Sequence, residues 1–310
     1  PVVVPDKAIT AKVPDNSSDV RISYDGSYAS YILDGKLNIM EVKNRNVIKT
    51  LSHNKDIFTY YKWLPDRNII LYSSRAPNEE AGRVQAMTFD VTSGNQHEYP
   101  KISGNIPRGS EIVDLELSTL TNVIYVKVKT SNSQAKIYRY NIMSELTYIM
   151  DTGMDTRISE PRFSDKLLYE EKGKIILYDA LKFSRTTVPF KGKMALLGIS
   201  SEDNEDIAYV GELGDDNKVH KIYYSKLNDK FTAEPEKSWA TTDVEKPASP
   251  GSYMIVRGGT VYELLDGLET LYNIKNKSKF SYTGKLVDIL ENYIVTLNNN
   301  ELKLSARKIQ

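Results

Sequence analysis

The sequence predicts an all-β protein in which a unit of four short strands is repeated. Segments of alternating apolar and polar residues recur along the whole chain, about forty residues apart. Asp, Asn and Gly stand between the segments, and these residues accept the positive φ angles of tight hairpin turns. The 310 residues also include 21 tyrosines, which suit strands with one face buried.

The clearest copy of the unit spans residues 19–51, where short turns separate the strand-like segments. Its strands are expected at residues 19–22, 27–33, 36–42 and 47–51. The second copy begins at Phe58 and repeats this order, with a longer loop around residues 76–82 between its middle strands. Each copy is therefore expected to form one antiparallel sheet.

Five weaker copies follow the first two. They are expected at residues 112–147, 159–189, 195–231, 249–267 and 286–304. Four strands repeated about every forty residues are typical of the blades of a β-propeller, in which sheets repeat radially. The sequence therefore predicts a single β-propeller of six to seven four-stranded antiparallel blades, with seven favoured.

The chain divides into a short N-terminal segment, residues 1–14, and the propeller, residues 15–310. Residues Ala8 to Val13 alternate as a strand does. Propellers usually close by pairing a strand from one end of the chain with the blade formed by the other end, which removes exposed sheet edges. The segment is therefore expected to be either a blade-closing strand or a disordered tether.

Two turns carry a family resemblance. They are Ser23-Tyr24-Asp25-Gly26 and Leu64-Pro65-Asp66-Arg67, each leading into an aromatic-rich strand. They resemble the Ser-Pro-Asp-Gly turn of bacterial TolB-type and dipeptidyl-peptidase-IV-type WD40-like repeats, although Tyr24 replaces the proline, Leu64 the serine and Arg67 the glycine. The resemblance implies a propeller, with this structural turn on the face opposite the usual ligand side.

The composition of the chain indicates which kinds of partner it binds and where in the cell it is located. Lys+Arg and Asp+Glu both number 41, which argues against nucleic-acid binding, and no apolar run approaches the roughly 20 residues of a membrane span. The chain has no cysteine and begins at Pro1. With the resemblance, these features lead us to expect a bacterial, extracytoplasmic protein of the cell envelope, which meets the membrane only through an anchor absent from this chain.

The residue pattern contains no linear catalytic or metal-binding motif. There is no Gly-x-Ser-x-Gly sequence, which a peptidase of the resembling family would need in a second domain. The three histidines, His53, His97 and His220, fall in different predicted blades without metal-ligand spacing. Acidic runs such as 203–206 do not match a calcium loop and are interpreted as solvated turns. No catalytic residue, metal or cofactor is predicted.

Topology predicts a binding face. In a propeller, the loops between blades and those between the second and third strands of each blade gather on one face, where ligands commonly dock. Trp239, in the irregular stretch 234–250 expected between blades, is either an exposed aromatic anchor or a residue buried against the rim. The candidate binding face comprises His53, Arg75, Arg83, Arg108, Arg157, Asp215 and Trp239.

The predicted function is that of a noncatalytic binding propeller whose partner is another protein or a cell-surface polymer. Locally grouped arginines pair well with carboxylates and steer an acidic partner even when net charge is zero. The other interpretation is that loops are polar in any soluble propeller. An alternative function is an enzyme, a lyase or hydrolase acting on a glycan or peptide, with its site in the central channel.

Overall fold

The fold is almost entirely β-sheet. The structure is a computed structural model that describes residues 8–307 except 53, 54, 79, 257, 266 and 268. Within these residues the strands form seven antiparallel sheets, six with four strands and one with five. The prediction of a β-propeller with six to seven blades, seven favoured, is therefore confirmed, with seven blades observed. The chain divides into two compact units, each with most of its residue contacts inside itself. Unit 1 comprises residues 1–115, 126–151 and 282–310, and unit 2 comprises residues 116–125 and 152–281.

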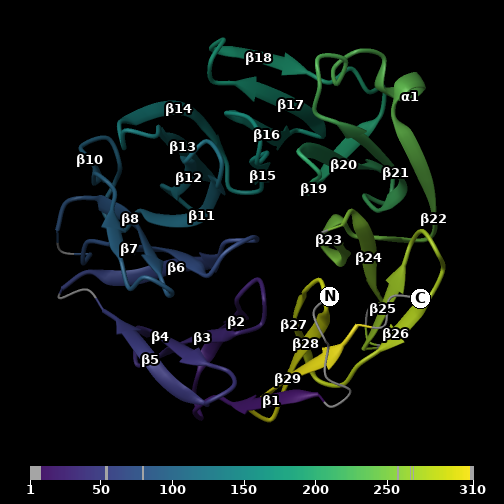
Figure 1. The fold of residues 1–310 in the computed structure, drawn as a ribbon. Coiled ribbons are helices and arrows are strands. Elements are labelled where there is room, and N and C mark those ends of the chain that lie inside the picture. Colours follow the sequence, from purple (N-terminus) through teal and green to yellow (C-terminus); the bar gives the residue numbers. More distant parts are fainter. Residues whose placement is uncertain are drawn as a thin grey trace. The chain divides into compact units, whose positions relative to one another are not determined.

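Unit 1 contains blades one, two and seven (Figure 1). Blade one has β2 (Ser18–Ile22), β3 (Tyr28–Leu33), β4 (Lys36–Glu41) and β5 (Asn46–Leu51). Blade two has β6 (Ile57–Trp63), β7 (Ile69–Arg75) and β8 (Arg83–Asp90), with β9 (Gln96–Glu98) and β10 (Ile102–Ser103) both paired to β8. Blade seven has β27 (Lys285–Ile289), β28 (Tyr293–Asn298), β29 (Glu301–Ala306) and β1 (Ile9–Lys12).

Blade three contributes strands to both units. It has β11 (Glu111–Ser118), β12 (Val123–Lys129), β13 (Gln134–Tyr140) and β14 (Leu146–Gly153).

Unit 2 contains blades four, five and six. Blade four has β15 (Ile158–Ser159), β16 (Lys166–Glu171), β17 (Lys174–Asp179) and β18 (Ser184–Thr187). Blade five has β19 (Lys193–Glu202), β20 (Glu205–Leu213), β21 (Val219–Lys226) and β22 (Ala240–Ala248), with the short helix α1 (Pro235–Ser238) before β22. After the turn η1 (Pro250–Ser252), blade six has β23 (Tyr253–Val256), β24 (Thr260–Leu265), β25 (Thr270–Asn273) and β26 (Lys279–Ser281).

The expected boundary after blade five was wrong. Residues 234–250 are not an irregular connection between blades, because β22 pairs antiparallel with β21 as the fourth strand of blade five. The sequence of β22, Ala-Thr-Thr-Asp-Val-Glu-Lys-Pro-Ala, has a single buried residue, Val244. An edge strand with so little apolar alternation carries no periodic signal, and its position is decided by pairing with β21.

Turn chemistry accounts for the short hairpins. Asp34 and Gly35 join β3 to β4 with φ angles of 50° and 69°, as a type I′ turn requires. At the preceding turn, the Asp25 carboxylate accepts hydrogen bonds from the backbone N–H of Ser27 and the side chain of Asn68, at 2.9 and 3.0 Å. This turn residue therefore links blade one to blade two.

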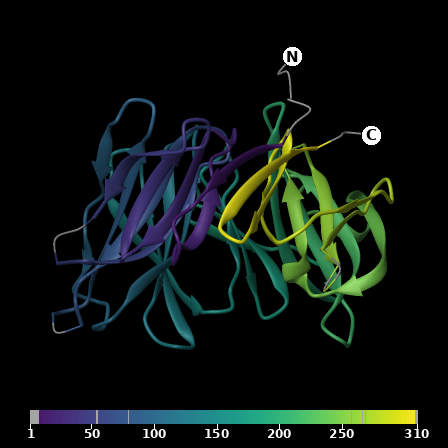
Figure 2. The ribbon, with the colours of Figure 1, turned by 90° about the horizontal axis from the view of Figure 1, so that it is seen from below.

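The segment Ile9–Lys12 takes the outer place in the sheet formed by the end of the chain. β1 runs antiparallel to β29, with Ala11 opposite Leu302 (Figures 1 and 2). Ala11 is buried in a cluster shared by blades seven and one, which also holds Tyr31, Met40 and Leu304. The strand thus covers an edge that would otherwise be open and adds apolar surface to the core.

Replacing Ala11 with Glu tests this arrangement. We expect Ala11→Glu to lower the free energy of unfolding by about 3 kcal/mol, because a carboxylate without a partner would enter an apolar cluster. Lys12→Glu is the matched control, since Lys12 is exposed on the same strand and should change stability by less than about 0.5 kcal/mol. Urea unfolding followed by circular dichroism measures both. Equal midpoints for the two variants would contradict the packing of β1.

Candidate binding site

In unit 1 the predicted face residues Arg75 and Arg83 lie at the facing ends of β7 and β8 and Arg108 lies in a turn, and two of these arginines already have partners. The Arg83 guanidinium pairs with both carboxylate oxygens of Asp56 at 2.7 Å. Arg75 donates to the Asn78 side chain at 2.7 Å and to a neighbouring backbone oxygen. Arg108 is exposed, and His53 lies outside the described residues. Two of these arginines therefore also serve to order their own loops.

In unit 2 the predicted residues differ in exposure. Asp215 is exposed in the loop between β20 and β21, and Arg157 donates to the backbone oxygen of Leu196 at 3.3 Å. Trp239 is 5% exposed, packs against Phe231 and Phe190, and donates its indole N–H to the Phe231 oxygen at 3.1 Å. Of the two alternatives for Trp239, the structure has the buried one, so Trp239 is no exposed anchor.

A different set of polar residues converges in unit 1, on the first strands of neighbouring blades. These strands carry β-bulges, where two residues oppose one on the second strand. The register shifts lie between Ser18 and Arg21 in β2, between Phe58 and Tyr60 in β6, and between Leu286 and Asp288 in β27. A bulge redirects the side chains that follow it. Arg21, Tyr60 and Asp288 each directly follow their bulge.

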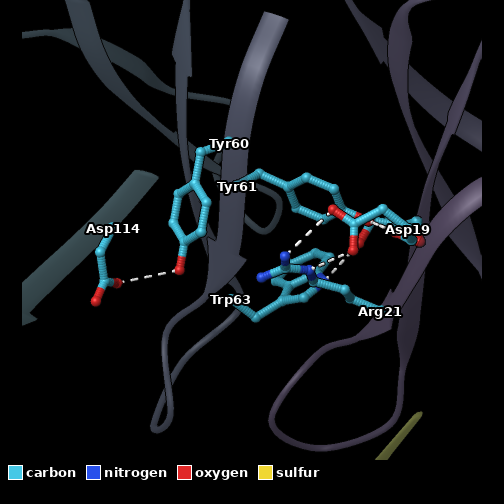
Figure 3. Close-up of polar contacts among 7 residues, drawn as sticks. Asp19, Arg21, Tyr60, Tyr61, Trp63 and Asp114 are labelled. Carbon is cyan, nitrogen blue, oxygen red and sulfur yellow. Dashed lines mark hydrogen bonds and ion pairs between the residues drawn. The ribbon is translucent and has the colours of Figure 1, made fainter. Parts of the chain in front are cut away.

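With Asp114 of β11, these residues form what we call the first-strand row: Asp288, Arg21, Tyr60 and Asp114. The Tyr60 hydroxyl donates to Asp114 Oδ1 at 3.2 Å (Figure 3). Asp114 Oδ1 also accepts the N–H of Leu115 at 2.9 Å, and Asp288 Oδ1 accepts that of Ile289 at 2.7 Å. The two aspartates therefore share one local geometry, each held by the next residue of its strand.

Arg21 is clamped from its own strand. Its Nε and Nη2 donate to the two carboxylate oxygens of Asp19 at 3.0 and 3.2 Å. Asp19 lies within the bulge with a φ of 47°, a left-handed conformation that Asp tolerates better than most residues. Within the described residues, the hydrogen bonds of this guanidinium go to Asp19 alone. The Nη1–Nη2 edge thus has no second hydrogen-bond partner there, and the side chain is partly exposed.

Blade two fixes Arg21 from the other side (Figure 3). The guanidinium carbon lies 4.7 Å from the ring centre of Tyr61 and 5.4 Å from that of Tyr60, within cation–π range. The Tyr61 hydroxyl donates to the backbone oxygens of Asp19 and, at 3.2 Å, Ser30. Trp63 donates its indole N–H to the Ser30 hydroxyl at 2.8 Å. The cation is therefore preorganised by contacts from two blades.

The electrostatics of the row follow from these contacts. Burial by itself would lower the pKa of Arg21, but the hydrogen bonds and charge of Asp19 outweigh it and raise that pKa. Burial raises the pKa of Asp288, opposed in part by the Ile289 N–H and by the charge of Arg21. One cation among three carboxylates can bind a group that carries both acceptors and donors.

Sequence reasoning missed the first-strand row. A signal was nevertheless present, because a charged residue stands between apolar residues in three first strands: Val20-Arg21-Ile22, Val113-Asp114-Leu115 and Val287-Asp288-Ile289. The signal emerges only when the copies are aligned on their first strands, because each triplet then shows a charged residue where an apolar one is expected.

Within the described residues, no three acidic or histidine side chains are placed to hold a metal ion, and no helix has the length and apolarity needed to cross a membrane.

The raised pKa of Asp288 predicts a pH-dependent stability difference. Because the folded-state pKa lies above the unfolded one, the folded protein binds more protons in that window, and its stability falls as pH rises through it. Asp288→Asn cannot ionise, so we expect it to be more stable than the parent at about pH 7, with the gain disappearing at about pH 3. Thermal unfolding across this range measures the difference. Asp34→Asn, in an exposed turn, corrects for the loss of one negative charge, and an equal profile for both variants would contradict the prediction.

Comparisons with known proteins bear on the fold. No protein-family model matches the chain, and no curated protein matches its sequence. Among solved structures, the β-propeller domain of Cps50 (Swd1) from Myceliophteria thermophila is similar, with a TM-score of 0.57 and 13% identity over 97% of this chain and 100% of that chain.

Two further solved structures resemble the chain more weakly. A putative dipeptidyl aminopeptidase IV from Bacteroides ovatus has a TM-score of 0.49 and 10% identity, over 86% of this chain and 46% of that chain. The WD40 domain of SCAP from fission yeast has a TM-score of 0.47 and 11% identity, over 95% and 85%. At such identities a match concerns the fold and not the chemistry. The Cps50 match and the seven antiparallel sheets identify the fold of this chain as a β-propeller.

Proposed function

We propose that this chain is a noncatalytic propeller that binds another protein, and that the first-strand row contacts the partner. The observation that carries the proposal is the preorganised guanidinium of Arg21. It is held by Asp19 along one edge and by two tyrosine rings, while its other edge makes no hydrogen bond within the described residues. Binding to such a group loses little side-chain entropy, which favours affinity.

The row matches the chemistry of a peptide. Backbone carbonyls and carboxylates of a partner would accept from the open edge of Arg21, and Asp114 and Asp288 would accept from its N–H groups. The Tyr60 ring adds an amphipathic surface of the kind enriched in protein interfaces. The row contains a hydrogen-bond donor, Arg21, and the acceptors Asp114 and Asp288. It therefore suits an extended peptide better than a ligand that carries only negative or only positive charge.

Catalysis by a lyase or hydrolase is the second candidate, and the raised pKa of Asp288 is the observation that favours it. A general acid must hold its proton near the operating pH. An enzyme of this kind would lose turnover in Asp288→Asn without losing affinity for its substrate. A binding site would lose affinity and have no turnover to lose.

We also propose that the protein acts in the bacterial cell envelope, outside the cytoplasm. The turn motifs around Asp25 and Asp66, which resemble envelope-type repeats, and the absence of cysteine support this location. Fractionation of the source bacterium, with antibody detection of the native protein, tests it. Recovery in the cytoplasmic fraction alone would contradict it.

Loss of the guanidinium should weaken peptide binding. We expect peptides selected from a random-peptide display library on the parent protein to bind Arg21→Ala at least about tenfold more weakly by calorimetry, since buried arginines are frequent hot spots. Arg21→Lys should recover only part of the affinity, because an ammonium cannot hold Asp19 and the ligand through two planar edges. Arg108→Ala, an exposed arginine outside the row, should bind as the parent does.

The same peptides distinguish the two candidate faces. A variant with Arg75, Arg83, Arg108 and Arg157 changed to Glu alters the loop face and leaves the row intact. If this variant loses binding while Arg21→Ala keeps it, the loops bind the partner and the row does not. Thermal unfolding of each variant separates lost contacts from lost folding.

A further inference from the structure

A cavity of about 280 Å³ lies within unit 2, where blade five meets blade six. Its walls come from β19, β20, β21 and β22 of blade five, and from β24, the turn before it and the residues after β25 in blade six. The volume is at the lower end of ligand pockets, which suits one long side chain rather than a nucleotide-sized molecule. No residue of the first-strand row takes part in it.

Two tyrosines and three aliphatic residues form the inner walls. Tyr209 and Tyr224 stack with ring centres 5.7 Å apart and planes inclined by 18°. Ile207, Ile222 and Ile274 line the cavity beside them. Burial raises the pKa of Tyr209 to about 12, with smaller contributions from Tyr224 and Glu202. The walls therefore offer apolar surface and two aromatic rings.

Glycines keep the cavity open on the blade-six side. Gly258 and Gly259 turn from β23 into β24 with φ angles of 93° and 69°. A Cβ atom at Gly259 would lie 2.5 Å from the Tyr209 hydroxyl, which donates to the Gly259 oxygen at 3.2 Å. A Cβ atom at Gly258 would lie 3.5 Å from the Glu202 carboxylate. Larger residues at this turn would close the space between the blades.

The cavity walls also include three exposed carboxylates, Glu202, Asp203 and Glu205, together with Lys275. Glu205 is neutralised by Lys226 at 2.6 Å. Glu202 makes no ion pair or hydrogen bond within the described residues, although it faces Tyr209 closely enough to affect its pKa. The carboxylates outnumber the ammonium groups, so the site attracts a cation.

We propose that this cavity binds an arginine or lysine side chain of a partner protein. The aliphatic stem would lie on the isoleucines, beside the faces of the stacked tyrosines, and the charged end would meet Glu202 and Asp203. Apolar walls combined with uncompensated carboxylates are complementary to such a long side chain and to no acidic or purely apolar one. The cavity is thus a second binding site, separate from the first-strand row.

Methyl NMR with defined peptides tests the proposal. The probes are acetyl-Gly-Arg-Gly-amide and its citrulline counterpart, which has the same shape without the charge. We expect the arginine peptide to shift the δ1 methyl signals of Ile207, Ile222 and Ile274 saturably, and the citrulline peptide to bind at least about fivefold more weakly. The methyl of Ile175, buried elsewhere in unit 2, should not move.

Variants assign the effect to the carboxylates. Glu202→Gln should weaken binding of the arginine peptide about threefold, and the double variant Glu202→Gln with Asp203→Asn about tenfold. Glu171→Gln removes an exposed carboxylate outside the cavity and should leave the affinity unchanged. Arg21→Ala should also leave it unchanged, which keeps this test independent of the first-strand row. Equal shifts with the citrulline peptide, or equal shifts at Ile175, would overturn the proposal.

Discussion

The structure depends on the inability of a four-stranded antiparallel sheet to bury its own apolar faces. Each blade needs a neighbour, because a single short sheet exposes too much apolar surface to be stable in water. Blades one and two meet through Leu37, Tyr61, Trp63 and Tyr72, all buried. Blades seven and one meet through Ala11, Tyr31 and Leu304. The segment Ile9–Lys12 contributes to this burial by completing the sheet of blade seven.

The first strands of these blades carry polar residues of the candidate site in addition to residues that pack between blades. Their bulges interrupt the alternation that would send every second side chain into a blade contact, and polar residues, among them Arg21 and Asp288, occupy the redirected positions. The charges are tolerated because each has a partner: Asp19 holds Arg21, Tyr60 holds Asp114, and the Ile289 N–H holds Asp288. The packing and the candidate site thus use the same strands, with the register shift separating their roles.

Two sites with different chemistry follow from one repeated unit. In the first-strand row a guanidinium is surrounded by carboxylates and aromatic rings, which suits the alternating donors and acceptors of a peptide. Between blades five and six, a glycine turn leaves a gap that tyrosines and isoleucines line and carboxylates border. A protein partner is the ligand class that offers both an extended backbone and a basic side chain.

The sequence by itself predicted six to seven blades, with seven favoured, and most of their hairpins, because turns such as Asp34–Gly35 and alternating strands are local signals. It did not reveal β22, whose exposed edge has no apolar period, or settle that Trp239 is buried. Only the tertiary structure decided which polar residues meet. A one-residue register shift redirects the side chains of Arg21, Tyr60 and Asp288, and pairing register depends on contacts between strands that residue spacing does not encode.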